Sequence, residues 1–547
     1  MNKKNLMINQ IKIISIFLGF LLITRAILLF NSPLEEFIKV VPDDSFYYLK
    51  LSCNFIDKKT WTFDGLNNTS GFHLIYAYLL VFFNKFLGCQ NWRITYLLMS
   101  LIAAFLISLS CYLTSNLVRK KVGYKYAIFA STIFFGRDVI LQSTAGMESG
   151  LVIFISSLLF YIFFKNENIS SLKKEKSFLN HKKNFLLFLL GIFLIGIRTD
   201  FLILSLIFYS SIQLRKKLKV FFKEKNHEKG SSQLYYDFKY LFVGTIVGYL
   251  LVAFHNYFFT KSFLQNSASI KFYWSSKIGH IKEPIFRLIG GNLPIPISWF
   301  NFKFQSYIIF ALIFLIFAIL INKIIKGRKL KIINFYFDDE NLLNQSVLLT
   351  LLGYGFFYSF NSAGIQTWYI SQFLTPLVIF ISYFLKFIEN NLKLLKFSYL
   401  ISLVLIINIF SGVYFSFNYR PYANQTEMLA AGKFLKNNFN NSTIGSWNSG
   451  IIGFFSKRDI VNIDGLVNNS VAPYIKNDNL ISYFKKAKID YVIDYETMLT
   501  NEYYSRRGGF SDRKLNKCLE KLEFKMDQSY KKFENSNIYL FKFKDKC

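Results

Sequence analysis

Long apolar runs recur along the chain from its N-terminus to about residue 416, separated by short polar or basic segments. A helix needs roughly 20 mostly apolar residues to cross the hydrocarbon of a bilayer, and several of these runs reach that length. The pattern therefore predicts about eleven membrane-spanning helices. Their predicted ranges are 11–30, 94–117, 125–142, 148–165, 184–197, 200–214, 240–259, 304–323, 342–361, 366–385 and 396–416. The run over 184–214 is divided at "GIRTD", because charged residues inside the bilayer are costly.

The distribution of charge orients these predicted helices. The chain carries a formal net charge of +32, and Lys and Arg gather in the short cytoplasmic loops of membrane proteins. If residues 72–88 lie in the interface and do not cross, the basic segments all fall on the cytoplasmic side with the N-terminus. The positive charge then reflects topology, and we predict no nucleic-acid partner. The predicted outer face carries residues 43–88, 145–149, 198–200, 260–303 and 364–369.

The residues that follow position 416 are more polar and change in pattern. "STIGSW", "DIVNID" and "IDYVID" predict short strands, and "NLISYFKKAK" predicts a helix. We therefore expect an α-helical polytopic membrane protein with a transmembrane domain over 1–416, interfacial helices in an outer loop over 43–88, and a small α/β soluble domain over 417–547 on the outer side.

Cysteine usage adds little to this picture. The five cysteines are scattered, with no CxxC motif and no metal-ligand spacing, so we predict neither a disulfide framework nor a zinc site. They are Cys53, Cys89, Cys111, Cys518 and Cys547.

An acidic pair, Asp43 and Asp44, stands in the first predicted outer loop, in the stretch "VPDDSFYYLK". Apolar residues recur after it at helical spacing, which predicts a short amphipathic helix lying in the interface. One Asp is enough to accept the free backbone N–H groups at the start of such a helix. The helix N-terminus would also favour an ionised carboxylate, which a general base requires. Capping and catalysis are compatible, and both interpretations stand.

Several segments together resemble the GT-C superfamily of integral-membrane glycosyltransferases. "DDSFYYLKLSCNF" followed by "TFDGLNNTSGFHLIY" is similar to the first outer loop of that superfamily, in particular of bacterial relatives of protein O-mannosyltransferases and aminoarabinose transferases. "AGMES", "IRTD" and "WNSGIIGFFSKRDIVNIDGLVN" look like recurrent segments of the same relatives. The resemblance covers most of the chain in order. The acidic loop together with the tail motif is fairly specific, and each other segment alone is weak.

The resemblance implies a lipid-linked sugar donor, usually a polyprenyl phosphate that carries a sugar. It assigns the catalytic or metal-associated role of the acidic pair to Asp43 and Asp44. Many relatives have Asp-Glu where this chain has Asp-Asp. A divalent cation, Mg²⁺ or Mn²⁺, at the pair is an open expectation, because the metal requirement differs across the superfamily. The implied location is a bacterial inner membrane, with the active site and the C-terminal domain facing the periplasm.

Other polar and aromatic residues of the outer face are candidates for substrate binding. Arg198 and Lys271 are candidates for the donor phosphate, although Arg198 is as readily explained by an ion pair with Asp200 or Glu148, and Lys271 by a solvated loop. Trp368 and Tyr369 fit an ordinary aromatic belt at the membrane surface better than sugar stacking. The full set of candidates is Tyr47, His73, Glu148, Arg198, Asp200, Lys271, Trp368 and Tyr369.

The leading hypothesis is a glycosyltransferase that moves a sugar from a polyprenyl-phosphate donor to a glycan, lipid or protein acceptor on the outer face. Asp43 or Asp44 would act as the base, the other carboxylate would orient it, and single displacement would invert the anomeric centre. A transporter or flippase of lipid-linked glycans is the alternative, although transporters more often show internal repeats and helices broken at the midplane. A membrane scaffold whose acidic pair only caps a helix is the third possibility.

Overall fold

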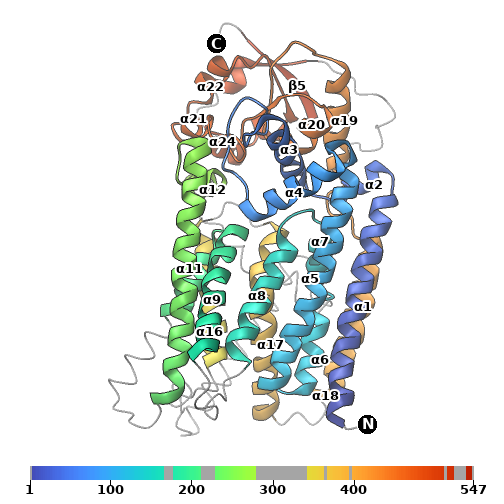
Figure 1. Cartoon of the computed structure of the whole chain (residues 1–547). Coiled ribbons are helices and arrows are strands. Elements are labelled where there is room, and N and C mark those ends of the chain that lie inside the picture. The colour runs from blue at the N-terminus through green and yellow to red at the C-terminus, as the bar shows by residue number, and fades with distance from the viewer. Residues whose placement is uncertain are drawn as a thin grey trace.

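The computed structural model describes residues 3–165, 177–210, 228–278, 342–361, 366–392, 397–510, 514–522, 538–544 and 547. Long helices run side by side, and a smaller α/β part containing the C-terminus sits over one end of them (Figure 1). The N-terminus lies at the opposite end. The predicted span 304–323 lies outside the described residues.

The helices of the bundle follow the apolar runs of the sequence. They are α1 (Lys3–Asn31), α5 (Trp92–Lys121), α6 (Tyr124–Ile133), α7 (Arg137–Ser143), α8 (Ser149–Phe164), α9 (Ser177–Ile197), a helix over Phe201–Ser210, α11 (Glu228–Thr260), α16 (Leu342–Asn361), α17 (Ile370–Leu392) and α18 (Phe397–Asn418). In the part of the chain that the structure describes, four helical stretches are long and apolar enough to cross a membrane: Asn9–Asn31, Cys89–Lys121, Phe238–Thr260 and Thr367–Phe387. The total of about eleven spans stays a prediction.

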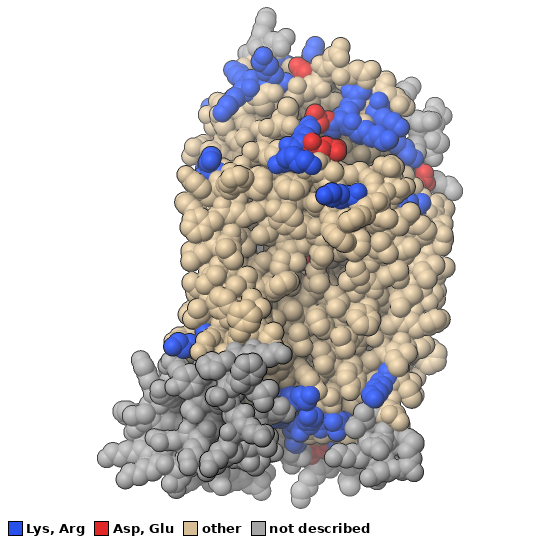
Figure 2. Space-filling model, in the orientation of Figure 1, with Lys and Arg blue, Asp and Glu red and all other residues tan. Residues whose placement is uncertain are grey.

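The outer surface of the bundle is apolar. Phe20, Phe105 and Phe258 are 66%, 62% and 73% exposed. Figure 2 shows Lys, Arg, Asp and Glu gathered toward the two ends of the molecule, with almost none across the middle of this face. An apolar belt between two charged ends matches the hydrocarbon layer and its two aqueous boundaries. The chain is an integral membrane protein.

One predicted span is wrong. Residues 125–142 form α6 and α7, not one helix, and the chain turns between them at Phe134–Gly136. Gly136 has an extended conformation (φ −59°, ψ 145°), and the charged pair Arg137–Asp138 starts the second helix. A hydropathy window averages over this short break, so the sequence pattern does not reveal it.

Short helices lie between the bundle and the α/β part. They are α2 (Leu34–Ile38), α3 (Asp43–Lys58), α4 (Leu74–Leu87), the 3-10 helix η1 (Cys89–Asn91) and α12 (Asn266–Ile278). The predicted amphipathic helix after the acidic pair is α3, which begins directly after Pro42 and ends at Lys59 in the left-handed conformation (φ 57°).

The prediction that the cysteines form no disulfides is wrong. Cys53 of α3 is bonded to Cys89 of η1, and Cys518 is bonded to Cys547. The paired cysteines are 36 and 29 residues apart in sequence, and the packing of α3 on α4 brings the first pair together. Their spacing carries no motif, so only the tertiary structure shows the pairing.

The C-terminal part is built on a mixed five-stranded sheet with the order β2-β1-β3-β5-β4. Its elements are α19 (Gln425–Asn437), β1 (Ile444–Ser446), α20 (Ser449–Phe455), β2 (Ile460–Asn462), α21 (Ala472–Lys476), α22 (Leu480–Ala487), β3 (Tyr491–Tyr495), α23 (Thr497–Thr500), α24 (Glu502–Gly508), α25 (Lys514–Cys518), β4 (Leu519–Lys521) and β5 (Ile538–Phe543). β1 pairs in parallel with β2 and β3, whereas β5 is antiparallel to β3 and β4. The three predicted strands and the predicted helix, α22, are confirmed. β4 and β5 were not predicted, and the boundary at residue 417 stays a prediction.

Candidate active site

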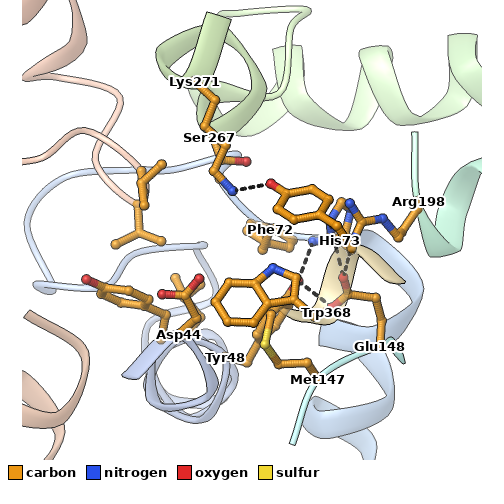
Figure 3. A pocket seen from close by; sticks show the side chains of 16 residues that line it. Asp44, Tyr48, Phe72, His73, Met147, Glu148, Arg198, Ser267, Lys271 and Trp368 are labelled. Atoms are coloured by element: carbon orange, nitrogen blue, oxygen red, sulfur yellow. Dashed lines mark hydrogen bonds and ion pairs between the residues drawn. The ribbon is translucent and has the colours of Figure 1, made fainter. Parts of the chain in front are cut away.

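A polar chamber lies where the bundle, the short helices and the C-terminal part meet. Its volume is about 60 Å³. Figure 3 shows Asp44, from α3, and Lys271, from α12, pointing into it from different sides. The chamber is lined by Asp44, Tyr47, Tyr48, Leu51, Gly71, Phe72, His73, Met147, Glu148, Arg198, Ser267, Lys271, Trp368, Tyr369, Leu466 and Val467. It thus collects every candidate residue predicted from the sequence except Asp43 and Asp200.

The two aspartates of the acidic pair face different neighbours. Adjacent residues of a helix point in directions about 100° apart, and here only Asp44 reaches the chamber. The backbone N–H groups of Ile451 and Gly450, at the start of α20, donate to the two carboxylate oxygens of Asp43 at 2.6 and 3.2 Å. The position before α3 is Pro42, and no side chain caps this helix. The capping interpretation is therefore wrong for α3 itself, whereas Asp43 does satisfy the free N–H groups of a helix far away in sequence.

Both carboxyl groups are held above their ordinary pKa by burial. Burial raises the pKa of Asp43 to about 7, and the hydrogen bond from Ile451 acts in the opposite direction. Burial also raises the pKa of Asp44, while the positive charges of Lys271 and Arg507 oppose the rise. Asp44 is thus a partly buried carboxyl group that lies within the electrostatic influence of two cations.

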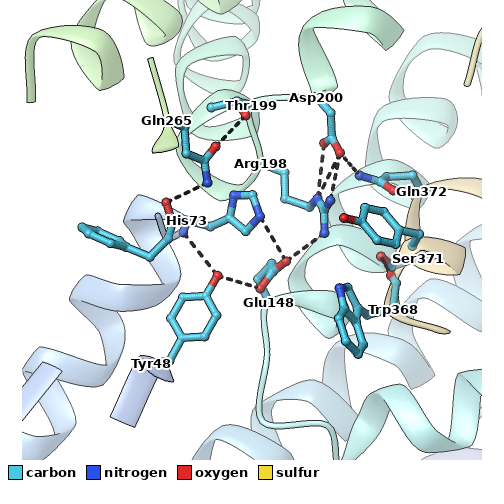
Figure 4. A network of polar contacts seen from close by, with 12 residues as sticks. Tyr48, His73, Glu148, Arg198, Thr199, Asp200, Gln265, Trp368, Ser371 and Gln372 are labelled. Atoms are coloured by element: carbon cyan, nitrogen blue, oxygen red, sulfur yellow. Dashed lines mark hydrogen bonds and ion pairs between the residues drawn. The ribbon is translucent and has the colours of Figure 1, made fainter. Parts of the chain in front are cut away.

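Arg198 lies at the break between α9 and the next helix and is 4% exposed. It donates to Oε1 of Glu148 and to Oδ2 of Asp200, each at 2.9 Å (Figure 4). The hydroxyl of Tyr48 donates to the other oxygen of Glu148 at 3.2 Å, and Gln372 donates to Asp200 at 2.5 Å. The ion-pair interpretation of Arg198 is therefore confirmed for both partners. Two carboxylates surround one guanidinium, so this network carries no surplus positive charge.

His73 precedes α4 and lines the chamber beside this network. Its Nε2 atom lies 3.5 Å from Oε1 of Glu148, and burial lowers the pKa of the imidazole to about 4. His73 is therefore neutral at physiological pH despite its carboxylate neighbour.

The acidic pair does not fit a shared divalent cation. Both oxygens of Asp43 accept backbone N–H groups, so Asp44 is the one member of the pair that reaches the chamber. In the described part of the chain, no group of three or more His, Cys, Asp or Glu side chains could hold a metal ion. A divalent cation at Asp44 stays a prediction.

Lys271 differs from Arg198 because no described carboxylate lies within ion-pair distance of it. Its ammonium donates to the hydroxyl of Tyr369 at 2.9 Å and lies 5.4 Å from the centre of that ring. Burial lowers the pKa of Lys271, but the Tyr369 hydroxyl and the Asp44 carboxylate outweigh burial and keep this pKa above its usual value. The ammonium therefore stays charged beside the chamber.

The aromatic-belt interpretation is wrong for Trp368 and Tyr369. They belong to the 3-10 helix η3 (Thr367–Tyr369) and are only 6% and 5% exposed. Their rings form a wall of the chamber and do not face lipid.

A second cavity, of about 440 Å³, adjoins the chamber. The two share His73, Arg198, Ser267, Lys271 and Tyr369. Most of the other residues along this groove are apolar: Leu202, Ile203, Val252, Ala253, Phe263, Leu264, Ala268, Phe272 and Phe357. Asp200, predicted from the sequence, lines the groove and not the chamber. The groove was not predicted, and no local signal in the sequence distinguishes the remaining chamber residues from ordinary ones: Tyr48, Leu51, Gly71, Phe72, Met147, Ser267, Leu466 and Val467.

The fold of this chain is similar to those of two solved structures. ArnT from Cupriavidus metallidurans bound to undecaprenyl phosphate is 11% identical, with a TM-score of 0.51 over 95% of this chain and 97% of ArnT. The archaeal oligosaccharyltransferase AglB from Archaeoglobus fulgidus, in complex with an inhibitory peptide and a dolichol-phosphate, is 11% identical, with a TM-score of 0.54 over 93% of this chain and 72% of AglB. At such low identity the likeness concerns the fold alone.

Residues 417–539 match a family described as a domain of unknown function, DUF8728. No curated protein shows significant similarity to the chain.

Proposed function

We propose that this protein is a membrane glycosyltransferase that moves a sugar from a polyprenyl-phosphate donor to an acceptor hydroxyl on the outer face of the membrane. The observation that carries the proposal is one chamber that holds a carboxylate and an ammonium and adjoins an apolar groove. The solved structures of ArnT and AglB contain undecaprenyl phosphate and dolichol-phosphate, which supports the same class of donor here.

The groove suits the polyprenyl tail of the donor, because the apolar walls of the groove can take the place of the lipid that surrounds this tail in the bilayer. The donor phosphate then lies where groove and chamber meet, beside Lys271 and Ser267, which line both. The sugar enters the chamber next to Asp44. This arrangement puts the anomeric carbon between a cation that stabilises the leaving group and a carboxylate that accepts a proton.

In the proposed reaction the acceptor oxygen attacks the anomeric carbon, and the bond from that carbon to the phosphate oxygen breaks. The electron pair leaves with the polyprenyl phosphate, whose developing charge the Lys271 ammonium stabilises. Asp44 takes the proton of the acceptor hydroxyl, a role that typically contributes about 10²–10⁴-fold in rate. Attack opposite the phosphate inverts the anomeric centre. Arg198 acts on the reaction indirectly, by holding Glu148 and Asp200.

The two disulfides support an extracytoplasmic site. Disulfides persist in oxidising compartments such as the bacterial periplasm and are rare in the cytosol. Cys53–Cys89 ties α3, which carries Asp44, to η1, and Cys518–Cys547 lies in the C-terminal part. Both therefore belong to the end of the molecule that charge analysis puts outside, in agreement with a bacterial inner-membrane enzyme facing the periplasm.

The proposal is tested by reconstituting the purified protein in vesicles with a radiolabelled polyprenyl-phosphate sugar and candidate glycan, lipid and protein acceptors. The expected result is label in an acceptor, together with free polyprenyl phosphate and an inverted anomeric configuration. Movement of the intact donor across the bilayer without any transfer would instead indicate a flippase. A product with the donor's own configuration would contradict single displacement.

A further inference from the structure

α20 of the C-terminal part lies along α3, the helix that carries Asp44 (Figure 1). Three side chains on one face of α3 bind it. Asp43 accepts the N–H groups of Gly450 and Ile451, and the Tyr47 hydroxyl accepts the N–H of Ser449 at 3.1 Å.

The third of these side chains is Lys50, which donates to the carbonyl oxygens of Gly453 (2.9 Å) and Arg458. Positions 43, 47 and 50 follow helical spacing, so they form one stripe along α3. α20 is thus held at its start by a carboxylate and near its end by an ammonium.

The two charged residues of this stripe are unusual for their burial. Asp43 and Lys50 are each 9% exposed, and in the described residues neither is within ion-pair distance of an opposite charge. Backbone groups of α20 and of Arg458 satisfy both. Because a buried charge is costly unless its polar groups are satisfied, α3 depends on the C-terminal part to keep these two residues in place.

The approach between the two helices is also close. A Cβ atom at Gly450 would lie 2.3 Å from the backbone oxygen of Asp43, and one at Gly453 would lie 2.8 Å from the Phe63 ring. Only glycine fits at residue 450 unless the backbone moves. This close contact fixes the start of α20 relative to the start of α3.

A second set of contacts ties the C-terminal part to α12, the helix that carries Lys271. The side chain of Asn266 donates to the carbonyl oxygens of Gly465 and Asn468, the latter at 3.1 Å. Leu466 and Val467, from the same loop, form a wall of the chamber. The loop therefore reaches both α12 and the site.

We propose that residues 417–539, which match the domain of unknown function, act as a positioning clamp that fixes Asp44 and Lys271 on facing sides of the chamber. In this clamp α20 holds α3 through Asp43, and the loop over 465–468 holds α12 through Asn266. This inference rests on the proposed function. Asp43 is then a positioning residue that acts through Asp44, and the acidic pair divides into one residue that reacts and one that anchors.

Kinetics of the full-length protein in vesicles test the clamp. Asp43→Ala removes the acceptor of both N–H groups and Asn266→Ala removes the link to α12, while neither residue lines the chamber. Each variant is expected to lower kcat by about tenfold to a hundredfold, because small misplacements of reacting groups are costly, and to leave the donor KM within about twofold. Asp43→Asn, which keeps one acceptor oxygen, is expected to recover part of the loss. Asp57→Asn, exposed on the same helix, is the matched control and should behave as wild type.

The pH profile separates positioning from a general loss of stability. Lys271 opposes the rise of the Asp44 pKa, so moving the two apart raises that pKa further and shifts the rising limb of kcat to higher pH. Hydrogen exchange on the same samples should speed up in α3 for Asp43→Ala and in α12 for Asn266→Ala, whether or not a substrate is known. If both variants keep the kcat, the pH limb and the hydrogen exchange of the wild type, the clamp is refuted. The proposed sugar transfer would not be affected by that result. Absence of transfer by the wild type would instead contradict the proposed function, and exchange would still decide the clamp.

Discussion

Replacement of Lys271 by Met removes the cation that is proposed to stabilise the leaving phosphate. The ammonium donates to the Tyr369 hydroxyl at 2.9 Å and pairs with no described carboxylate, so the substitution breaks one hydrogen bond and no salt bridge. Met keeps a long unbranched stem in the same space. The expected effect on folding is therefore about 1 kcal/mol, the net value of a typical hydrogen bond.

The expected effect on catalysis is larger. Removing one donor from a developing oxyanion costs about 2.7–4 kcal/mol, which corresponds to about 10²–10³ in kcat. Initial rates of transfer from a polyprenyl-phosphate sugar measure the change, with thermal melting measured on the same preparation. Lys277→Met, exposed in the last turn of the same helix, is the matched control and should leave the rate unchanged. A folded Lys271→Met variant that transfers at the wild-type rate would refute the assignment of the phosphate to this ammonium.

Three further outcomes are expected. The ionised form of Asp44 is the proposed base and burial raises its pKa, so kcat should rise with pH through a limb above the ordinary Asp value of about 3.9. A limb at that value would contradict Asp44 as the base. The double substitution Cys53→Ser, Cys89→Ser should lower the free energy of unfolding by about 2–4 kcal/mol. In the unreduced wild-type protein neither cysteine should react with an alkylating reagent, and alkylation of either one would contradict the pairing. Ala253 lies on the wall of the groove, and Ala253→Trp should raise the KM for the lipid donor by roughly tenfold because the larger side chain overfills the site. The kcat at saturating donor should change little. An unaltered KM would exclude the groove as the donor site.

The bundle was predictable because lipid-facing helices are apolar at almost every position. This signal lies in the sequence of each helix and does not depend on which other segments pack against it. Phe258, 73% exposed on α11, is an example of a residue that only a membrane environment explains. The break between α6 and α7 was not predictable in the same way, since three residues do not change a hydropathy average. The disulfides were missed for another reason, because cysteine pairing depends on which segments pack together.

The candidate site was partly predictable. Asp44 was singled out as a member of an acidic pair in a loop that resembles that of the GT-C superfamily, whereas Lys271 was a candidate for the phosphate that a solvated loop explains as readily. Their meeting in one chamber is a consequence of tertiary packing, as is the inclusion of Leu466, an ordinary apolar residue of the tail. The division of the acidic pair was beyond sequence reasoning because it depends on α20, whose N–H groups occupy Asp43 and leave Asp44 facing the chamber.

Asp44→Asn is the decisive substitution, because Asp44 is the residue that is proposed to take the acceptor proton. The variant keeps the size and a hydrogen-bonding group of the side chain but cannot accept the proton. Transfer from the polyprenyl-phosphate sugar should fall by about 10²–10⁴-fold, with donor binding retained, while Asp57→Asn on the same helix transfers at the wild-type rate. A folded Asp44→Asn protein with wild-type transfer would contradict the account.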